Sequence, residues 1–208
     1  MNVFTPFLVG LLCSLFGTLL PGLLNASVVK IHKKEDKKKA HQFISGALFV
    51  IALQTYLAVF FARLINDNAE INFVLREIGT FVFIGLSIFF FVKKKKPAEE
   101  LEINVPRKIN RILFGSFLAV LNIFPIFLYV FVTVYAASKN WYEINPINNF
   151  LLTIGVLLGT YTAFRLYIQI FKNKSIDTNF FLKNINTILG VLTLTIALIN
   201  AYKLIDEI

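Results

Sequence analysis

Six long apolar stretches, separated by short polar segments, constrain this chain more than any other feature of its sequence. They run roughly over residues 3–29, 42–62, 73–92, 112–137, 147–171 and 184–202. A helix of about 20 apolar residues crosses the hydrocarbon core of a bilayer. Transmembrane β-strands would alternate apolar and polar residues over about ten positions, and residues 81–92 show no such alternation. The sequence therefore predicts an all-α integral membrane protein with six transmembrane helices.

The composition excludes several other classes of protein. Hydrophobic residues make up 57% of the chain and charged residues 16%, against about 45–50% and about 25% in soluble domains. One Cys excludes an internal disulfide, and with only two His the chain has no set of metal ligands or catalytic acid–base pair. We therefore expect no metal, no cofactor and no enzymatic activity. The longest polar segment, residues 93–111, is too short for a soluble domain, which leaves one transmembrane domain over residues 1–208.

The placement of the basic residues predicts the orientation. Sixteen of the 21 Lys and Arg residues lie in the polar segments after the first, third and fifth stretches, and four lie on the other side. Short loops rich in Lys and Arg stay cytoplasmic. We therefore expect a multi-pass protein of a bacterial-type cytoplasmic (inner) membrane with both termini outside. The net charge of +9 then reflects topology and attraction to lipid head groups, and we expect no nucleic-acid binding.

The two halves of the sequence resemble each other. Residues 75–80 read Leu-Arg-Glu-Ile-Gly-Thr and residues 182–187 read Leu-Lys-Asn-Ile-Asn-Thr, at the start of the third and sixth stretches. We predict repeats over about 1–92 and about 112–208, joined by the cytoplasmic loop 93–111. Because each repeat has three helices, the second would be inverted relative to the first, as in many transporters. The alternative is that apolar helices resemble one another by composition.

A proline interrupts each repeat near the middle of its first stretch, Pro21 in one and Pro125 in the other. Proline lacks a backbone N–H and clashes with the carbonyl four residues earlier, which here frees the carbonyls of Gly17 and Leu121. Such a carbonyl in hydrocarbon costs on the order of several kcal/mol unless something satisfies it. Either nearby side chains satisfy a simple kink, or the breaks line a cavity for water and substrate. On the second interpretation, the substrate-binding or gating residues are Pro21, Gly22, Asn25, Gln54, Asn122 and Pro125.

Arg165 lies within the fifth stretch, seven residues before Lys172. Helical side chains tilt toward the helix N-terminus, which directs Arg165 into the bilayer. A charge near the bilayer centre costs about 2.5–3.5 kcal/mol. We therefore predict that Arg165, with Tyr161 on the same face, lines the cavity and meets a substrate carboxylate or a conformational gate. The alternative is that Arg165 snorkels to the head groups.

Glu77 is the one acidic residue inside the six stretches. It lies near the outer end of the third stretch, beside Arg76. We consider two roles for Glu77, a proton-coupling or outer-gate carboxylate and a solvated interfacial charge.

Residues 21–25, Pro-Gly-Leu-Leu-Asn, precede a Lys-rich segment and Gly46. This pattern resembles the Pro-Gly-Pro motif of the lysine-exporter (LysE/RhtB-type) translocator family. The resemblance continues through residues 78–85 and 115–125. Leu23 replaces the second proline of the motif, and two residues separate the Asn and Pro that are adjacent in the family. The resemblance implies export of amino acids or other small solutes, driven by an ion gradient.

These observations predict a secondary transporter, an exporter of amino acids or similar small solutes that alternates access around a mid-membrane cavity. The alternative is a non-transporting membrane assembly or scaffold subunit, whose helices only pack. Convergence of the polar positions on one cavity would favour transport. The expected partners are a small solute, the lipid bilayer and a coupling ion. The sequence leaves open whether the chain forms a homo-oligomer.

Overall fold

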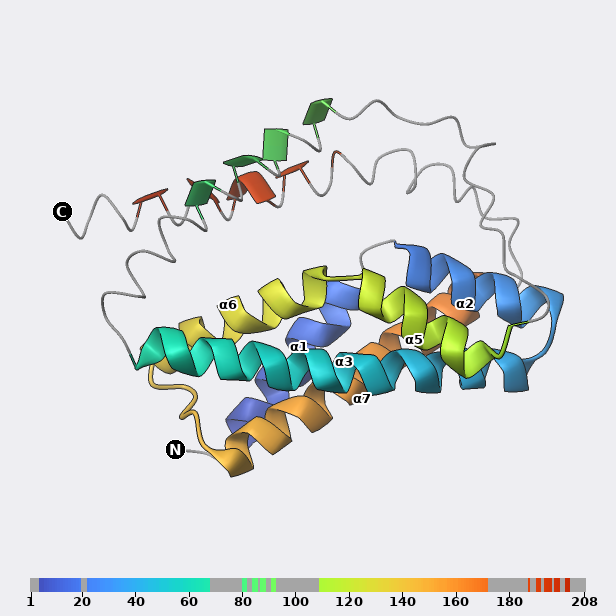
Figure 1. Ribbon diagram of the computed structural model, residues 1–208, viewed down its shortest axis with the longest axis horizontal. Coiled ribbons are helices and arrows are strands. Elements are labelled where there is room, and N and C mark those ends of the chain that lie inside the picture. Colours follow the sequence, from blue (N-terminus) through green and yellow to red (C-terminus); the bar gives the residue numbers. More distant parts are fainter. Residues whose placement is uncertain are drawn as a thin grey trace. The chain divides into compact units, whose positions relative to one another are not determined.

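The computed structural model consists of helices (Figure 1). They are α1 (Phe4–Leu19), α2 (Leu23–Lys34), α3 (Lys37–Asn66), α5 (Arg111–Leu121), α6 (Phe124–Ser138) and α7 (Pro146–Phe171). The residues that the structure describes are 4–19, 22–67, 80–81, 84–85, 87–88, 91–92, 109–171, 187, 190–191, 193–195, 197–198 and 201–202. Every element among them is helical, which confirms the predicted all-α class. The predictions for Pro21 and Glu77 lie outside these residues.

Two helices, α3 and α7, are each long and apolar enough to cross a membrane. The pairs α1–α2 and α5–α6 also meet this criterion when each pair is taken as one bent run, with bends of 74° and 60°. The described part of the chain thus contains two to four candidate spans. Large apolar side chains follow the outer surface of α3 at helical spacing, as a lipid-facing helix requires; they are Phe49, Leu53, Tyr56 and Phe60.

The Lys-rich segment after the first stretch is helical, where the sequence predicted a loop. Helix α2 continues to Lys34 and α3 begins at Lys37, so the turn between them is short. Lysine favours helix, and the Asp36 carboxylate accepts a hydrogen bond from the Lys39 backbone N–H at 2.5 Å, as a helix-capping side chain does. Helix α3 therefore has 30 residues and a length of about 45 Å, and its basic first turn is exposed.

The chain forms two compact units that differ from the predicted repeats. Unit 1 comprises Met1–Arg63 and Ile103–Ser175, and unit 2 comprises Leu64–Glu102 and Ile176–Ile208. Unit 1 holds the helices named above except the last turn of α3. Within unit 2, the Ser87 hydroxyl donates to the Gly190 carbonyl at 3.2 Å, so the third and sixth predicted stretches contact each other. Each unit thus combines elements from both halves of the sequence.

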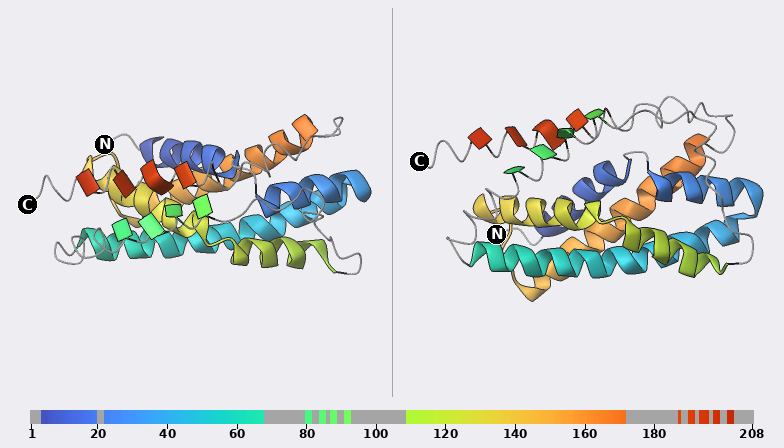
Figure 2. Two further views of the ribbon diagram at one scale, coloured as in Figure 1. Left: turned by 90° about the horizontal axis from the view of Figure 1, so that it is seen from above. Right: turned by 45° about the horizontal axis from the view of Figure 1, so that its top comes forward.

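Glycines allow close helix crossings in unit 1 (Figure 2). A Cβ added at Gly10 of α1 would collide with the Leu152 carbonyl of α7, and one at Gly155 of α7 would collide with α1. Gly155 and Gly159 lie one turn apart on α7, and this small-residue spacing lets α1 approach the α7 backbone closely.

Glycines also allow α5 to cross closely over α3. A Cβ at Gly46 of α3 would collide with the Ile112 carbonyl of α5, and one at Gly115 of α5 would collide with the Phe43 carbonyl of α3. The Ser116 hydroxyl adds a hydrogen bond to the Gly46 carbonyl at 3.0 Å. The leading helix of each bent run is therefore packed, backbone against backbone, on a long straight helix.

Candidate solute-binding cavity

The two helix breaks meet about halfway along α3 in unit 1 (Figure 1). Helices α1 and α5 end at this level, and α2 and α6 begin there. Ile51, near the midpoint of α3, lies beside both breaks. A broken helix leaves backbone carbonyls at one end and N–H groups at the other without intrahelical partners, so each break brings both kinds of group to the same place.

At the α5–α6 break, one side chain from another helix satisfies two carbonyls. The Gln54 amide of α3 donates to the Ala119 and Asn122 carbonyls, each at 3.0 Å. Gln54 is buried, with 7% of its surface exposed. Pro125 lies in the first turn of α6, where its missing N–H breaks no helical hydrogen bond. Gln54 therefore satisfies the Asn122 carbonyl and adds a second donor to the Ala119 carbonyl, which also accepts from the Asn122 backbone N–H at 3.1 Å.

At the α1–α2 break, two side chains from different helices each satisfy one carbonyl. The Asn25 amide of α2 donates to the Thr18 carbonyl at 2.6 Å, and the Tyr167 hydroxyl of α7 donates to the Leu19 carbonyl at 2.8 Å. Gly22 precedes α2 in an extended conformation, with no atom within 4 Å of an added Cβ. These two side chains therefore satisfy the Thr18 and Leu19 carbonyls, and the prediction for the Gly17 carbonyl depends on Pro21, which lies outside the described residues.

A cavity of about 210 Å³ lies between the two breaks. For comparison, water occupies about 30 Å³ per molecule in the liquid, and an apolar cavity of about 150 Å³ accepts benzene. The cavity is lined by Gly17, Thr18, Gly22, Leu23, Leu24, Asn25, Ile51, Leu118, Leu121, Asn122, Phe124, Pro125, Leu128, Tyr129 and Phe164. Among these described residues, the polar side chains are uncharged amides and hydroxyls.

The structure brings together most of the sequence-predicted site residues that it describes. Gly22, Asn25, Asn122 and Pro125 line the cavity. Gln54 is a neighbour of the cavity, because it binds the carbonyl of the lining residue Asn122. Tyr161 and Arg165 are not among the lining residues.

Arg165 and Tyr161 meet His41 of α3. The Arg165 guanidinium lies 3.4 Å from the His41 Nε2 atom, and the rings of Tyr161 and His41 are 6.5 Å apart between centroids. His41 Nδ1 lies 2.7 Å from the Lys37 carbonyl, so a neutral His41 can donate through Nδ1 and accept from Arg165 through Nε2. Arg165 therefore contacts the basic first turns of α3, where the sequence predicted a substrate carboxylate or a conformational gate.

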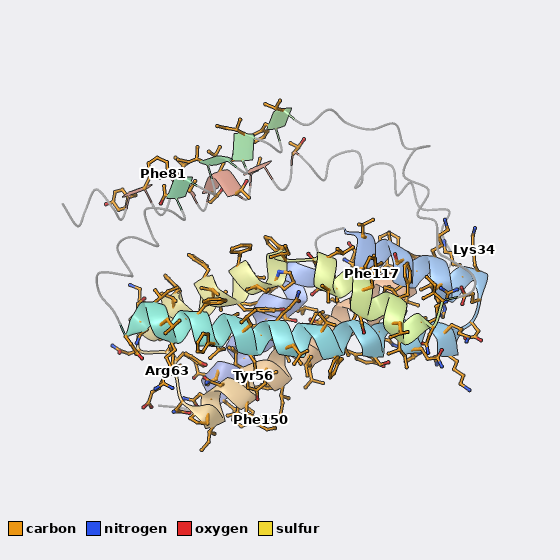
Figure 3. The ribbon with its side chains drawn as sticks, viewed as in Figure 1. Lys34, Tyr56, Arg63, Phe81, Phe117 and Phe150 are labelled. Carbon is orange, nitrogen blue, oxygen red and sulfur yellow. The ribbon has the colours of Figure 1, made fainter. Side chains whose placement is uncertain are left out.

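An ion pair between the buried Arg111 and the partly exposed Glu35 joins the two bent runs. The Arg111 guanidinium, at the start of α5, donates to both carboxylate oxygens of Glu35, at 2.9 and 2.5 Å. The Arg111 side chain is 3% exposed and the Glu35 side chain 26% exposed. Figure 3 shows where the end of α2 lies in unit 1: Lys34, the residue before Glu35, lies on the opposite side of the view from Arg63, near the end of α3. The ion pair thus fastens the end of α2 to the beginning of α5 at the basic end of unit 1.

Sequence reasoning missed three contributors to this region. Tyr167 caps α1, Thr18 and Tyr129 line the cavity, and none of them stood out in an apolar, aromatic-rich chain. One signal could have identified Tyr167: it follows Gly159 by eight residues, as Gln54 follows Gly46. In both α3 and α7, a crossing glycine therefore comes two turns before a side chain that caps a broken helix.

No family model, curated protein or solved structure matches this chain.

Proposed function

We propose that this chain is a multi-pass membrane transporter that moves small solutes by alternating access around the cavity between the two helix breaks. The observation that carries the proposal is the convergence of both breaks, with Asn25 and Asn122, on one cavity. Side chains from other helices donate hydrogen bonds to the backbone carbonyls at the ends of α1 and α5, so specific contacts stabilise both breaks. A scaffold subunit would need neither interrupted helices nor a cavity at their junction.

The crosswise packing of unit 1 supports an inverted repeat. In such a repeat, the first and fourth spans correspond, as do the second and fifth. Helix α1 of the first span packs on α7 of the fifth, and α5 of the fourth span packs on α3 of the second, through glycines in each case. Gln54 of α3 and Tyr167 of α7 each cap the helix on which their own helix packs. Inverted repeats with broken helices at the midplane are typical of secondary transporters.

We further propose six spans with both termini outside, which places the turn between α2 and α3 on the cytoplasmic face of an inner membrane. The Arg111–Glu35 pair would then hold the two bent runs together on the cytoplasmic side of the cavity. The resemblance to the lysine-exporter family supports export driven by an ion gradient, and Glu77 stays a candidate for coupling to protons.

Flux in proteoliposomes tests this proposal. The full chain is reconstituted, and uptake is measured for radiolabelled amino acids and for neutral amides of similar size, with and without imposed proton or sodium gradients. We expect saturable uptake of at least one compound. The proposal fails if no compound enters faster than it enters liposomes that hold the cavity-blocked variant Gly22→Leu.

A matched pair of variants separates blocked transport from damaged folding. Gly22 and Gly85 each have open space around an added Cβ, but only Gly22 lines the described cavity. Gly22→Leu should therefore remove flux, whereas Gly85→Leu should retain it. Equal flux in both variants would show that the cavity is not the route.

A further inference from the structure

The cavity between the helix breaks has a neutral lining. Its described polar side chains are those of Thr18, Asn25, Asn122 and Tyr129, and no described lining residue is charged. An isolated charge in an apolar site costs far more than a neutral polar group, so buried charges are normally paired with opposite charges. The lining offers hydrogen bonds to a solute but no counter-charge.

Two arginines of unit 1 that could have supplied a counter-charge contact groups outside the cavity. Arg165 follows the lining residue Phe164 in sequence, but its guanidinium lies against His41. The Arg111 guanidinium donates two hydrogen bonds to the Glu35 carboxylate. Both guanidinium groups therefore have contacts outside the cavity, and neither is among the groups that line it.

The helix ends at the cavity do not supply a net charge. Each break contributes one C-terminal end and one N-terminal end, whose opposite partial charges of about half an electron offset each other. Gln54, Asn25 and Tyr167 bind carbonyls at the C-terminal ends, while the N-cap residues of α2 and α6, Gly22 and Ile123, form no side-chain cap hydrogen bond. The breaks therefore favour a solute that presents an acceptor oxygen.

We infer that the solute bound in this cavity is a small uncharged molecule with an apolar body and an acceptor oxygen, such as a short branched amide. This inference rests on the proposed transport function and narrows it, because a free amino acid is a zwitterion at neutral pH. The cavity volume of about 210 Å³ suits a molecule of the size of benzene or somewhat larger, because an apolar cavity of about 150 Å³ already accepts benzene.

Four probes that share an isobutyl group test the charge requirement. They are isovaleramide, which is neutral; isovalerate, an anion; isoamylamine, a cation; and leucine, a zwitterion. The measurement is the melting temperature of the purified full chain in detergent, since a ligand that binds only the folded state raises it. We expect a saturable upward shift with isovaleramide and a smaller shift, or none, with the three charged probes at equal concentration.

Variants locate the binding. The shift should disappear in Gly22→Leu and in the smaller variant Gly22→Val, whose own melting transitions report whether each is folded. It should persist in Gly85→Leu and in Arg165→Gln. A larger shift with leucine or isovalerate overturns the inference, as does a shift lost in Arg165→Gln or the absence of a shift with all four probes.

The flux assay separates failure of this inference from failure of the proposed function. If isovaleramide binds but never crosses the membrane, transport is wrong and the neutral site stands. If leucine crosses the membrane and isovaleramide does not bind, transport stands and the neutral site is wrong.

Discussion

The two helix breaks of unit 1 are alike in packing and unlike in capping. At both breaks, glycines let the first helix of the bent run pack backbone against backbone on a long straight helix. At the α5–α6 break, Gln54 alone donates to two carbonyls. At the α1–α2 break, Asn25 of the same run and Tyr167 of α7 each donate to one carbonyl.

This difference separates two requirements of a broken helix in a membrane. The leading half must be held by packing, which needs backbone contact and therefore glycine. Its exposed carbonyls must be satisfied, and any correctly placed amide or hydroxyl can do so. We therefore expect equal sensitivity of the two runs to changes in packing and unequal sensitivity to changes in capping.

The largest effect should come from the crossing glycines. Gly115→Val in α5 and Gly10→Val in α1 each force a side chain against a backbone carbonyl of another helix, which cannot rotate away. We expect each variant to lose more than about 3 kcal/mol of stability, above the usual range for overpacking, measured by SDS-induced unfolding. Gly85→Val, in open space, is the control. A large loss in one run and none in the other would contradict equal packing.

The next largest effect should come from the ion pair that joins the two runs. Glu35→Gln leaves the Arg111 guanidinium, 3% exposed, without its carboxylate. We expect a loss of about 3 kcal/mol, the low end for a broken buried pair, because Glu35 itself is partly exposed. The same unfolding measurement checks it, and Glu143→Gln, outside this pair, should change stability little. A loss no greater than the control would mean that the pair does not hold the runs together.

Gln54→Met keeps the size of the side chain and removes both hydrogen bonds at the α5–α6 break. We expect a loss of about 2 kcal/mol, at about 1 kcal/mol per hydrogen bond. The unfolding free energy in mixed micelles measures it. If the loss is no larger than that of Tyr167→Phe, the proposed asymmetry of capping is wrong.

Tyr167→Phe should have the smallest effect. It removes one hydrogen bond, to the Leu19 carbonyl, while Asn25 keeps its bond to the neighbouring Thr18 carbonyl. We expect a loss of about 1 kcal/mol in the same unfolding assay. Tyr161→Phe, whose ring lies near His41, serves as a control. A loss above about 2 kcal/mol would show that the two caps at this break depend on each other.

The sequence predicted the features that follow from short-range chemistry. The apolar stretches predicted helices long and apolar enough to cross a membrane, and proline with nearby asparagine indicated where two helices break. Each of these features depends on residue type and spacing along one helix.

Features that depend on partners between helices could not be predicted in the same way. Gln54 and Tyr167 act as caps because α3 and α7 place them beside another helix's broken end. Arg165 shows the same limit, because tilt along its own helix predicted a cavity-facing cation, whereas His41 on α3 supplies its contact. The Lys-rich segment over residues 30–39 is helical where the sequence predicted a loop, because lysine is frequent in the cytoplasmic loops of membrane proteins and also favours helix.

The central claim is that the two breaks enclose a cavity that water and a solute can enter. The most direct test is the reaction of a cysteine at position 22 with a small, charged thiol reagent in proteoliposomes, in a Cys13→Ser background. Thiolates form and react where water reaches them. We predict that Gly22→Cys reacts much faster than Leu12→Cys, which lies on the outer apolar surface of α1 with 48% of its area exposed. Equal, slow reaction at both positions would contradict the claim.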